Sequence, residues 1–319
     1  MVTTATNVQV FDKELYQALA ERASAYAREN ALVNKIPVAL APFNMEQYKK
    51  PVFGETDNIR GGRPSVGDKV TTRKDTKVFE LADVYMTLYW DQYDIMKEGK
   101  FLEQMKTEQL QEWARQANMS LLKGVFDEGY SNPAVDATGS AGQGNKLING
   151  ILDDADTVAD LDGTDSALTA AGDVYAALVK MVTSIPFRYV QGKEIILGMT
   201  PHFYEMANSA TFTNTAGKTE WEMFMDKHVS GPSPYKVSSE IMFSDDLFKV
   251  AGDVTNTNDR LFAVIAEPNI IERAYSRGFG KMGPDIPNSV GGIEQTWTVK
   301  EAGCVIRPEA VLLSEVITW

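Results

Sequence analysis

The sequence contains few of the residues on which most catalytic and metal sites depend. It has one cysteine, Cys304, and two histidines, His202 and His228, among 319 residues. A single cysteine excludes an internal disulfide framework, and two histidines leave little material for metal binding or acid–base catalysis. The motifs of serine hydrolases, zinc proteases, dinucleotide-binding folds and thiol oxidoreductases are missing as well. We therefore predict no catalytic residue, no cofactor and no metal site, and we favour a structural role over an enzymatic one.

Three further absences narrow the class of protein. No run of about 18 apolar residues is present, so we expect no transmembrane helix. The first residues have neither a basic start nor an apolar signal core, which argues against secretion. Basic residues are outnumbered, and the net charge of −13 is unlike that of a free-standing nucleic-acid-binding module. These features predict a soluble protein that is made in a reducing cytoplasm.

The composition that remains is that of a folded chain. It is 44% hydrophobic, 24% charged and 10% aromatic, which is enough to bury a core. The length suggests about two domains. Helical and strand-like segments are mixed without a regular βαβ period or an internal repeat, which predicts the α+β class. Cys304 stands in an apolar strand-like segment, so we interpret it as a small buried residue rather than a nucleophile.

The longest helical signal runs from Gly99 to Gly129. Good helix formers dominate this segment, and its apolar residues recur at spacings of three and four. A helix over the whole segment would be about 40 Å long at roughly 1.5 Å per residue. An amphipathic core helix is the simplest interpretation, but a helix this long can also form the backbone of a flat molecule. The residues that we predict to pack along its apolar stripe are Leu110, Trp113, Ala117 and Leu121.

A basic, turn-rich segment precedes the helix, at residues 54–77. Its Gly pairs and alternating Val and Thr residues predict a two-stranded ribbon, and Ile59 is its one large apolar side chain. Three interpretations stay open: a disordered surface loop, a nucleic-acid-contacting ribbon, or a hairpin that becomes ordered by lying on another copy. The spacing of a phosphate-binding loop is missing. The candidate contact residues are Arg60, Arg63, Lys69, Arg73, Lys74 and Lys77.

An acidic run lies beyond the long helix. Residues 153–173 contain seven Asp and neither Lys nor Arg. Carboxylate oxygens are the ligands that calcium prefers, but the spacing of an EF-hand is absent. An acidic surface loop is therefore favoured over a calcium site. Asp173 is placed to start a helix over Val174–Ser184. The Gly- and Asn-rich residues 129–149 between the long helix and this run are predicted to be a loop.

Other segments have clear local signals. The N-terminal region predicts an extended arm and then a helix near Asp12–Asn30. Residues 78–96 predict a strand with one irregularity, residues 194–200 a buried strand, and Pro201 the start of a helix. Strands are also predicted at LFAVIAEP, at Thr296–Val299, at Gly303–Ile306 and at Val311–Ile317.

The order of these segments, together with three short stretches, resembles a known family. The stretches are NGIL at Asn149–Leu152, GMTPHFYEMA at Gly198–Ala207 and VIRPEAVLLSEV at Val305–Val316. The sequence is similar in this way to the major capsid proteins of tailed phages, which have the Hong Kong 97-like shell fold. That fold has an N-terminal arm, an extended loop, a peripheral domain with a long spine helix, and an axial domain. On this chain it implies an arm at 1–45, an extended β-hairpin loop at 46–82, a peripheral domain at 83–164 and 266–319 with its spine at about 99–129, and an axial domain at 165–265.

The resemblance also implies a function. A member of this family assembles with itself, through pentamers and hexamers, into an icosahedral shell that encloses viral double-stranded DNA without sequence-specific binding. It would be assembled in the host cytoplasm and reside in the virion, with no membrane contact. Separate scaffolding, portal and decoration proteins are the further partners that such a shell can have. The alternatives are an encapsulin-like cellular compartment shell and a soluble α+β enzyme or sugar-binding protein.

Overall fold

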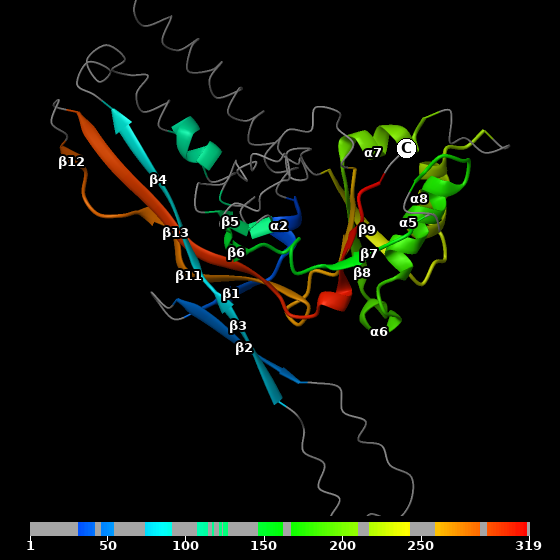
Figure 1. The fold of residues 1–319 in the computed structure, drawn as a ribbon, viewed down its shortest axis with the longest axis horizontal. Coiled ribbons are helices and arrows are strands. Elements are labelled where there is room, and N and C mark those ends of the chain that lie inside the picture. Colours follow the sequence, from blue (N-terminus) through cyan, green and yellow to red (C-terminus); the bar gives the residue numbers. More distant parts are fainter. Residues whose placement is uncertain are drawn as a thin grey trace, which may run out of the picture.

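The structure is a computed structural model in which most of the strands belong to two sheets (Figure 1). Each of these sheets has five strands, and two further pairs of strands stand apart from them. The residues that the structure describes are 31–41, 46–53, 74–90, 107–113, 117, 121–122, 124–126, 146–161, 167–209, 217–242, 259–287 and 292–317.

The first sheet is built around one long strand. Its strands are β1 (Val38–Leu40), β4 (Ala82–Trp90), β11 (Ile271–Lys281), β12 (Ile286–Pro287) and β13 (Ile293–Val305). Strand β13 pairs antiparallel with β4, β11 and β12, and β1 pairs parallel with β11. Two separate strands were predicted within 296–306. They are one strand because β13 has hydrogen-bonded neighbours along its whole length.

Helical residues cover one face of this sheet. Val84 lies opposite Val299, and Met86 lies opposite Trp297, so these side chains share a face. Trp113 and Ala117, both helical, pack against Val299 in a cluster on that face. We call it the helix-side face. The opposite face carries Tyr85, Thr87, Tyr89, Ile286, Glu294, Thr296 and Thr298, and we call it the open face.

The helical residues within the predicted segment 99–129 end before Gly124. Described residues 107–113, 117 and 121–122 are helical, and those in between lie outside the described part of the chain. Gly124 has a φ of 89°, a left-handed conformation that suits glycine and ends helices. It begins strand β5 (Gly124–Phe126), which pairs with β6 (Lys146–Asn149). The predictions of helix as far as Gly129 and of loop through residue 149 are therefore wrong at these positions.

The second sheet has the strand order β7-β14-β10-β8-β9. These strands are β7 (Asp156–Val158), β8 (Glu194–Met199), β9 (Lys236–Met242), β10 (Leu261–Val264) and β14 (Val311–Ser314). Every residue of the central strand β10 is fully buried, as its run of four apolar residues predicts. Strands β7 and β14, which the sequence assigned to the peripheral domain, are hydrogen-bonded into this sheet. The division into peripheral and axial domains stays a prediction.

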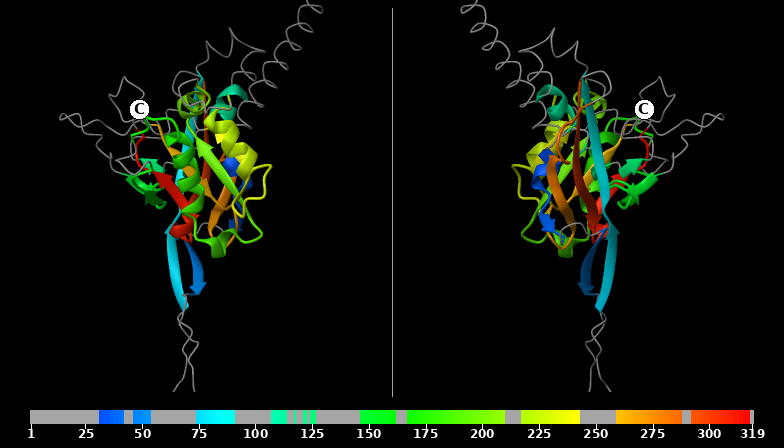
Figure 2. Two further views of the ribbon diagram at one scale, coloured as in Figure 1. Left: turned by 90° about the vertical axis from the view of Figure 1, so that its right-hand side faces the viewer. Right: turned by 90° about the vertical axis from the view of Figure 1, so that its left-hand side faces the viewer.

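Helices cover the side of the second sheet that faces away from the first sheet (Figures 1 and 2). The three longest there are α5 (Asp173–Thr183), α7 (Pro201–Ala207) and α8 (Glu220–His228). Thr200 caps α7 ahead of a proline, and Thr219 forms a capping box with Glu222 at α8. The short helix α6 (Phe187–Val190) connects α5 to β8. The proline after Thr200 explains why the sequence located the helix that starts at Pro201.

One apolar core joins the helices, the second sheet and the helical residues Leu121 and Leu122. It contains Leu121 and Ile151 beside Phe203, Phe224 and Phe262, all of them buried. The helix α2 (Ala31–Lys35) adds two more side chains, so helical residues reach beyond Asn30 and stop just before Pro37. Of the predicted arm at 1–45, residues 1–30 and 42–45 lie outside the described part of the chain.

The first sheet and this core meet at Gly303. A Cβ atom on Gly303 would lie 2.7 Å from a side-chain carbon of Ile151 and 2.8 Å from the backbone oxygen of Leu121. No side chain fits there without a shift, so glycine is required by close approach. The contact brings Leu121 and Ile151 directly against β13.

A hairpin extends beyond the end of the same sheet, roughly in line with β4 (Figures 1 and 2). Strand β2 (Gln47–Phe53) pairs antiparallel with β3 (Lys74–Glu80), and β3 leads through Leu81 into β4. Figure 2 shows the two strands extending away from the body of the molecule. The described part of this hairpin agrees with a two-stranded element within 46–82, and the segment that would form its tip, 54–73, lies outside the described residues.

Candidate functional site

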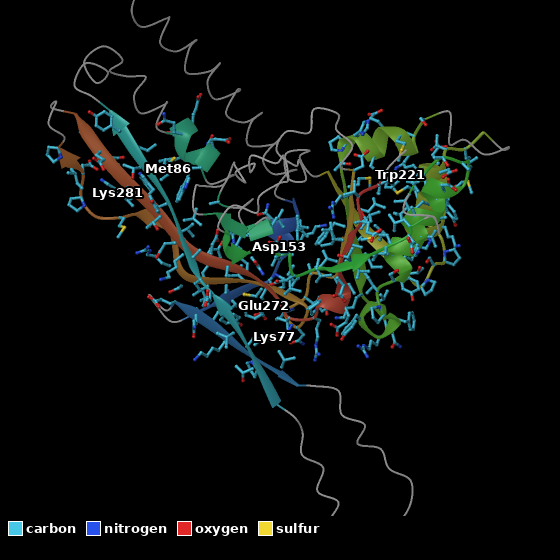
Figure 3. All side chains as sticks on the ribbon, viewed as in Figure 1. Lys77, Met86, Asp153, Trp221, Glu272 and Lys281 are labelled. Carbon is cyan, nitrogen blue, oxygen red and sulfur yellow. The ribbon has the colours of Figure 1, made fainter. Side chains whose placement is uncertain are left out.

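The base of the hairpin is fixed to the body by polar side chains. Glu272, on β11, accepts a hydrogen bond from the hydroxyl of Tyr48 at 2.7 Å and forms an ion pair with Lys50. The Glu272 side chain is only 4% exposed. Lys77, the partner of Lys50 in the hairpin register, donates to the backbone oxygen of Val305 at 3.5 Å. In Figure 3 Glu272 and Lys77 lie close together where the hairpin leaves the sheet.

Apolar packing at the same place uses mostly small residues. Tyr48 and Phe79 stack with ring centroids 6.4 Å apart, and both pack against a buried cluster on the open-face side of the sheet. That cluster consists of Ala41, Leu81, Ala274, Ala302 and Cys304. Burial, with the Glu272 carboxylate nearby, raises the pKa of the Tyr48 hydroxyl and of the Cys304 thiol. Both groups are protonated near neutral pH, and a buried thiol is a poor nucleophile.

The upper part of the open face has large exposed side chains. Tyr85 is 70% exposed, Tyr89 55% and Ile286 56%. Both tyrosines point away from the helix-side face, because their neighbours Val84 and Met86 occupy it. Scattered surface apolar residues are normal, but three on one flat sheet face form a patch of the kind that subunits bury in contacts.

Ion pairs separate this patch from the hairpin base. Asp83 binds Arg277 at 2.7 Å and Lys300 at 3.5 Å. Since Lys300 lies opposite Asp83 across β13 and β4, this network also belongs to the face that carries the tyrosines. The hairpin base, the ion pairs and the tyrosine patch therefore follow one another along a single face of the first sheet.

The basic residues predicted as contacts lie mainly beyond the described hairpin. Arg60, Arg63, Lys69 and Arg73 fall outside the described residues. Lys74 begins β3 and pairs with Phe53, and Lys77 binds the body as above. Their role as contacts between subunits stays a prediction.

The predicted helix stripe consists of mostly buried side chains. Trp113, Ala117 and Leu121 are each at most 4% exposed, whereas Leu110 is half-buried. Trp113 and Ala117 contact the sheet, and Leu121 belongs to the large core that includes the second sheet. The described stripe residues therefore pack partly against the first sheet and partly into the large core.

The two histidines have structural partners. His202 Nδ1 lies 2.7 Å from a carboxylate oxygen of buried Asp259, which also accepts a hydrogen bond from Thr200. His228 is buried and stacks on Phe224 at a centroid distance of 4.8 Å. Burial lowers the pKa of His228, so its imidazole is neutral near pH 7.

Carboxylates of the acidic run bind nearby backbone groups. Asp153 accepts from the Gly150 amide at 2.7 Å, and Asp173 accepts from Thr169 and Ala170 amides. Within the described residues, no group of three or more His, Cys, Asp or Glu side chains is arranged to hold a metal ion. The same residues contain no helix with the length and hydropathy needed to cross a bilayer.

Solved shell proteins have a similar fold over nearly the whole chain. One chain from the capsid of Myoviridae phage XM1 matches with a TM-score of 0.59 at 12% identity, covering 91% of this chain and 92% of that one. The capsid of a native GTA particle matches with a TM-score of 0.59 at 12% identity, covering 92% and 91%. A virus-like particle from Pyrococcus furiosus matches with a TM-score of 0.53 at 11% identity, covering 96% and 99%. No family model matches the sequence, and no curated protein matches it.

The chain therefore shares its fold with proteins of solved capsids and particles. The chain has a mixed α+β, Hong Kong 97-like fold of the kind found in tailed-phage and GTA capsids, which confirms the resemblance stated from the sequence. The identities of 11–12% in these comparisons lie too low to transfer individual residues from one chain to another.

Sequence reasoning missed the residues that define the open face and the hairpin base. Tyr85 and Tyr89 lie four residues apart, on the same face of a segment that the sequence predicts only as a strand. Their period of two was the available signal for a second, exposed face. Glu272 gave no such signal, because its partners Tyr48 and Lys50 lie more than 220 residues away in the chain.

Proposed function

We propose that this protein is the major capsid protein of a tailed phage or a related particle, and that copies of it assemble into a closed icosahedral shell around double-stranded DNA. The observation that carries the proposal is the shared fold over about nine-tenths of the chain and of its structural relatives. The role is structural rather than catalytic, and the partner that matters is a second copy of the chain.

The placement of the hairpin and the patch on one sheet face favours contact between copies. The described hairpin points away from the tyrosine patch, since β3 runs toward β4 and the patch lies on β4 (Figure 1). A hairpin that continued through residues 54–73 would extend about 33 Å further, at about 3.3 Å per residue. A hairpin that kept the direction of β2 and β3 would lead away from its own patch, so we expect it to lie on the next copy.

The chemistry of the two surfaces also favours this contact. The segment 54–73 has one large apolar residue and four cationic ones, Arg60, Arg63, Lys69 and Arg73. Guanidinium and ammonium groups can stack over exposed tyrosine rings such as Tyr85 and bind carboxylates. A contact in which one surface binds a different surface of the next copy is heterologous and can close into rings and shells.

The remaining anatomy follows from the same proposal. The helix before Gly124 would be the spine of a peripheral domain, with its stripe residues as the packing core, and the region 165–265 would be an axial domain near the symmetry axes. The proposed arm at 1–45 would reach a neighbouring subunit. Scaffolding, portal and decoration proteins would be separate chains.

A cellular compartment shell is the second candidate. The similarity to the virus-like particle from Pyrococcus furiosus covers 96% of this chain. This similarity favours, as the second possibility, a particle other than a phage head. The two candidates differ in cargo, because a phage shell encloses DNA.

Sedimentation velocity with nuclease treatment tests the proposal. The purified chain, alone or with its native co-expressed partners, should sediment as a particle in the megadalton range. DNA protected from nuclease in particles from an infected host would assign the phage role, and particles from the native cell that enclose protein in place of DNA would assign the compartment. A uniform species below about 150 kDa under all these conditions would refute both.

A further inference from the structure

Glu272 is a buried carboxylate whose two side-chain partners both come from the hairpin. Tyr48 and Lys50 stand two residues apart on β2, so they project from the same side of that strand. Tyr48 donates to one carboxylate oxygen at 2.7 Å, and Lys50 binds the other. Glu272 itself lies on β11, opposite Cys304 of β13. Each oxygen of the carboxylate thus holds one hairpin side chain.

The other contacts at the base are less directional. Tyr48 and Phe79 pack against Ala274, Ala302 and Cys304, whose small side chains form a smooth surface. Apolar contacts of this kind resist separation but tolerate sliding and rotation. The Lys77 bond to the Val305 carbonyl, at 3.5 Å, is at the long limit of a hydrogen bond. Among the side-chain contacts at the hairpin base, those of the Glu272 carboxylate are therefore the ones that best fix the angle of the hairpin.

A small error in that angle has a large effect at the far end. For an arm about 33 Å long, a rotation of about 10° moves the tip by about 6 Å, which exceeds the spacing of roughly 4.8 Å between neighbouring strands. A displacement of that size would take the cationic segment out of register with a neighbouring copy.

We propose that Glu272 is a positioning residue that locks the hairpin to the body at the angle needed for contact with the next subunit. Because one buried carboxylate binds both Tyr48 and Lys50, the orientation of the hairpin is fixed before the subunits assemble. This inference deepens the proposed function and rests on it for its consequence in assembly, whereas the lock itself is a property of the single chain.

Hydrogen exchange measured by mass spectrometry on the full-length unassembled subunit tests the lock. Glu272→Gln should accelerate exchange in β2 and β3 by about tenfold to hundredfold, the range expected for losing a hydrogen bond to a charged group. Exchange in β10 and β14 should not change, which verifies that the variant is folded. Lys50→Met alters only the hairpin side and should give the same pattern, and Lys50→Arg should restore slow exchange.

Glu309→Gln is the matched control. Glu309 also accepts from a tyrosine, Tyr189, at 2.6 Å and lies beside Arg188, but it holds η3 (Pro308–Ala310) to α6 rather than the hairpin. It should leave exchange in β2 and β3 unchanged. If the variants of Glu272 and Lys50 also leave exchange there unchanged, the lock does not exist.

Particle assembly separates the lock from the proposed function. Glu272→Gln should lower the yield of closed particles at least tenfold, while Glu309→Gln assembles normally. Fast hairpin exchange with a normal particle yield would overturn the role of the lock in assembly. Wild-type chain that never forms particles would instead refute the proposed function, and the exchange result would still decide whether Glu272 locks the hairpin.

Discussion

Glu220, on helix α8, caps the N-terminus of helix α5 and so links the two helices. Its carboxylate, 3% exposed in the first turn of α8, accepts hydrogen bonds from the amides of Gly172 and Tyr175 at the start of α5. Amides in the first turn of a helix have no partner within the helix, and the helix dipole favours a negative charge there. We predict that Glu220→Gln destabilises the fold, although the two side chains have nearly the same shape.

The size of the effect follows from the contacts. The substitution removes the charge and turns one acceptor oxygen into an NH₂ group that faces a backbone N–H. A buried hydrogen bond to a charged group contributes about 1.5–3 kcal/mol, and the other bond is weakened as well. We expect a loss of about 3 kcal/mol, which is more than a hundredfold in the unfolding equilibrium.

Urea unfolding followed by tryptophan fluorescence, with hydrogen exchange at α5, measures this loss. Glu222→Gln is the matched control in the same helix, because the exposed Glu222 makes only the capping-box bond to the Thr219 amide at 2.9 Å. Because Gln can also complete a capping box, only the charge near the helix N-terminus is lost, and stability should fall by about 0.3–1 kcal/mol. Equal losses from the two substitutions, or unchanged exchange at α5 in Glu220→Gln, would refute the capping role of Glu220.

Three further predictions test other parts of the account. Neutralising Arg60, Arg63 and Lys69 together should abolish particles in sedimentation while circular dichroism stays unchanged; a wild-type yield would remove the loop from the contact. Leu121→Asp should prevent soluble expression, because an unpaired charge would enter the core beside Ile151; a stable, soluble variant would contradict that packing. Burial lowers the pKa of His228, so the unfolded chain binds a proton more readily, and stability should fall as pH drops below about 6.5. Urea midpoints at pH 7.5 and 5.5 should then differ more in wild type than in His228→Gln, and an equal pH dependence would contradict this assignment.

Segments with strong local signals were predictable from the sequence. The buried strand before Thr200, the helix that Pro201 starts, and the apolar run of β10 each combine a cap or breaker with a clear pattern. The α+β class and the shell fold followed from the order of such segments. These features depend on neighbouring residues, which a single sequence displays.

Features that depend on distant partners were not predictable. Strand β6 lies in a Gly- and Asn-rich stretch that suggests a loop, and it exists because β5 pairs with it. Strand β13 continues through Glu301 because β4 and β11 pair with it there, and the buried Glu301 carboxylate binds the guanidinium of Arg273 on β11 at 2.7 and 2.9 Å. Glu272 is a further case, because its environment is created by the hairpin. In each case the deciding contact joins segments that are far apart in the chain.

Negative-stain electron microscopy of the full-length protein, expressed alone and with its native partners, tests the central claim most directly. The account predicts closed shells of uniform diameter, or rings of five and six subunits that convert to shells when partners are added. A preparation that contains only small, discrete oligomers under every condition would contradict the proposal that this chain builds a shell.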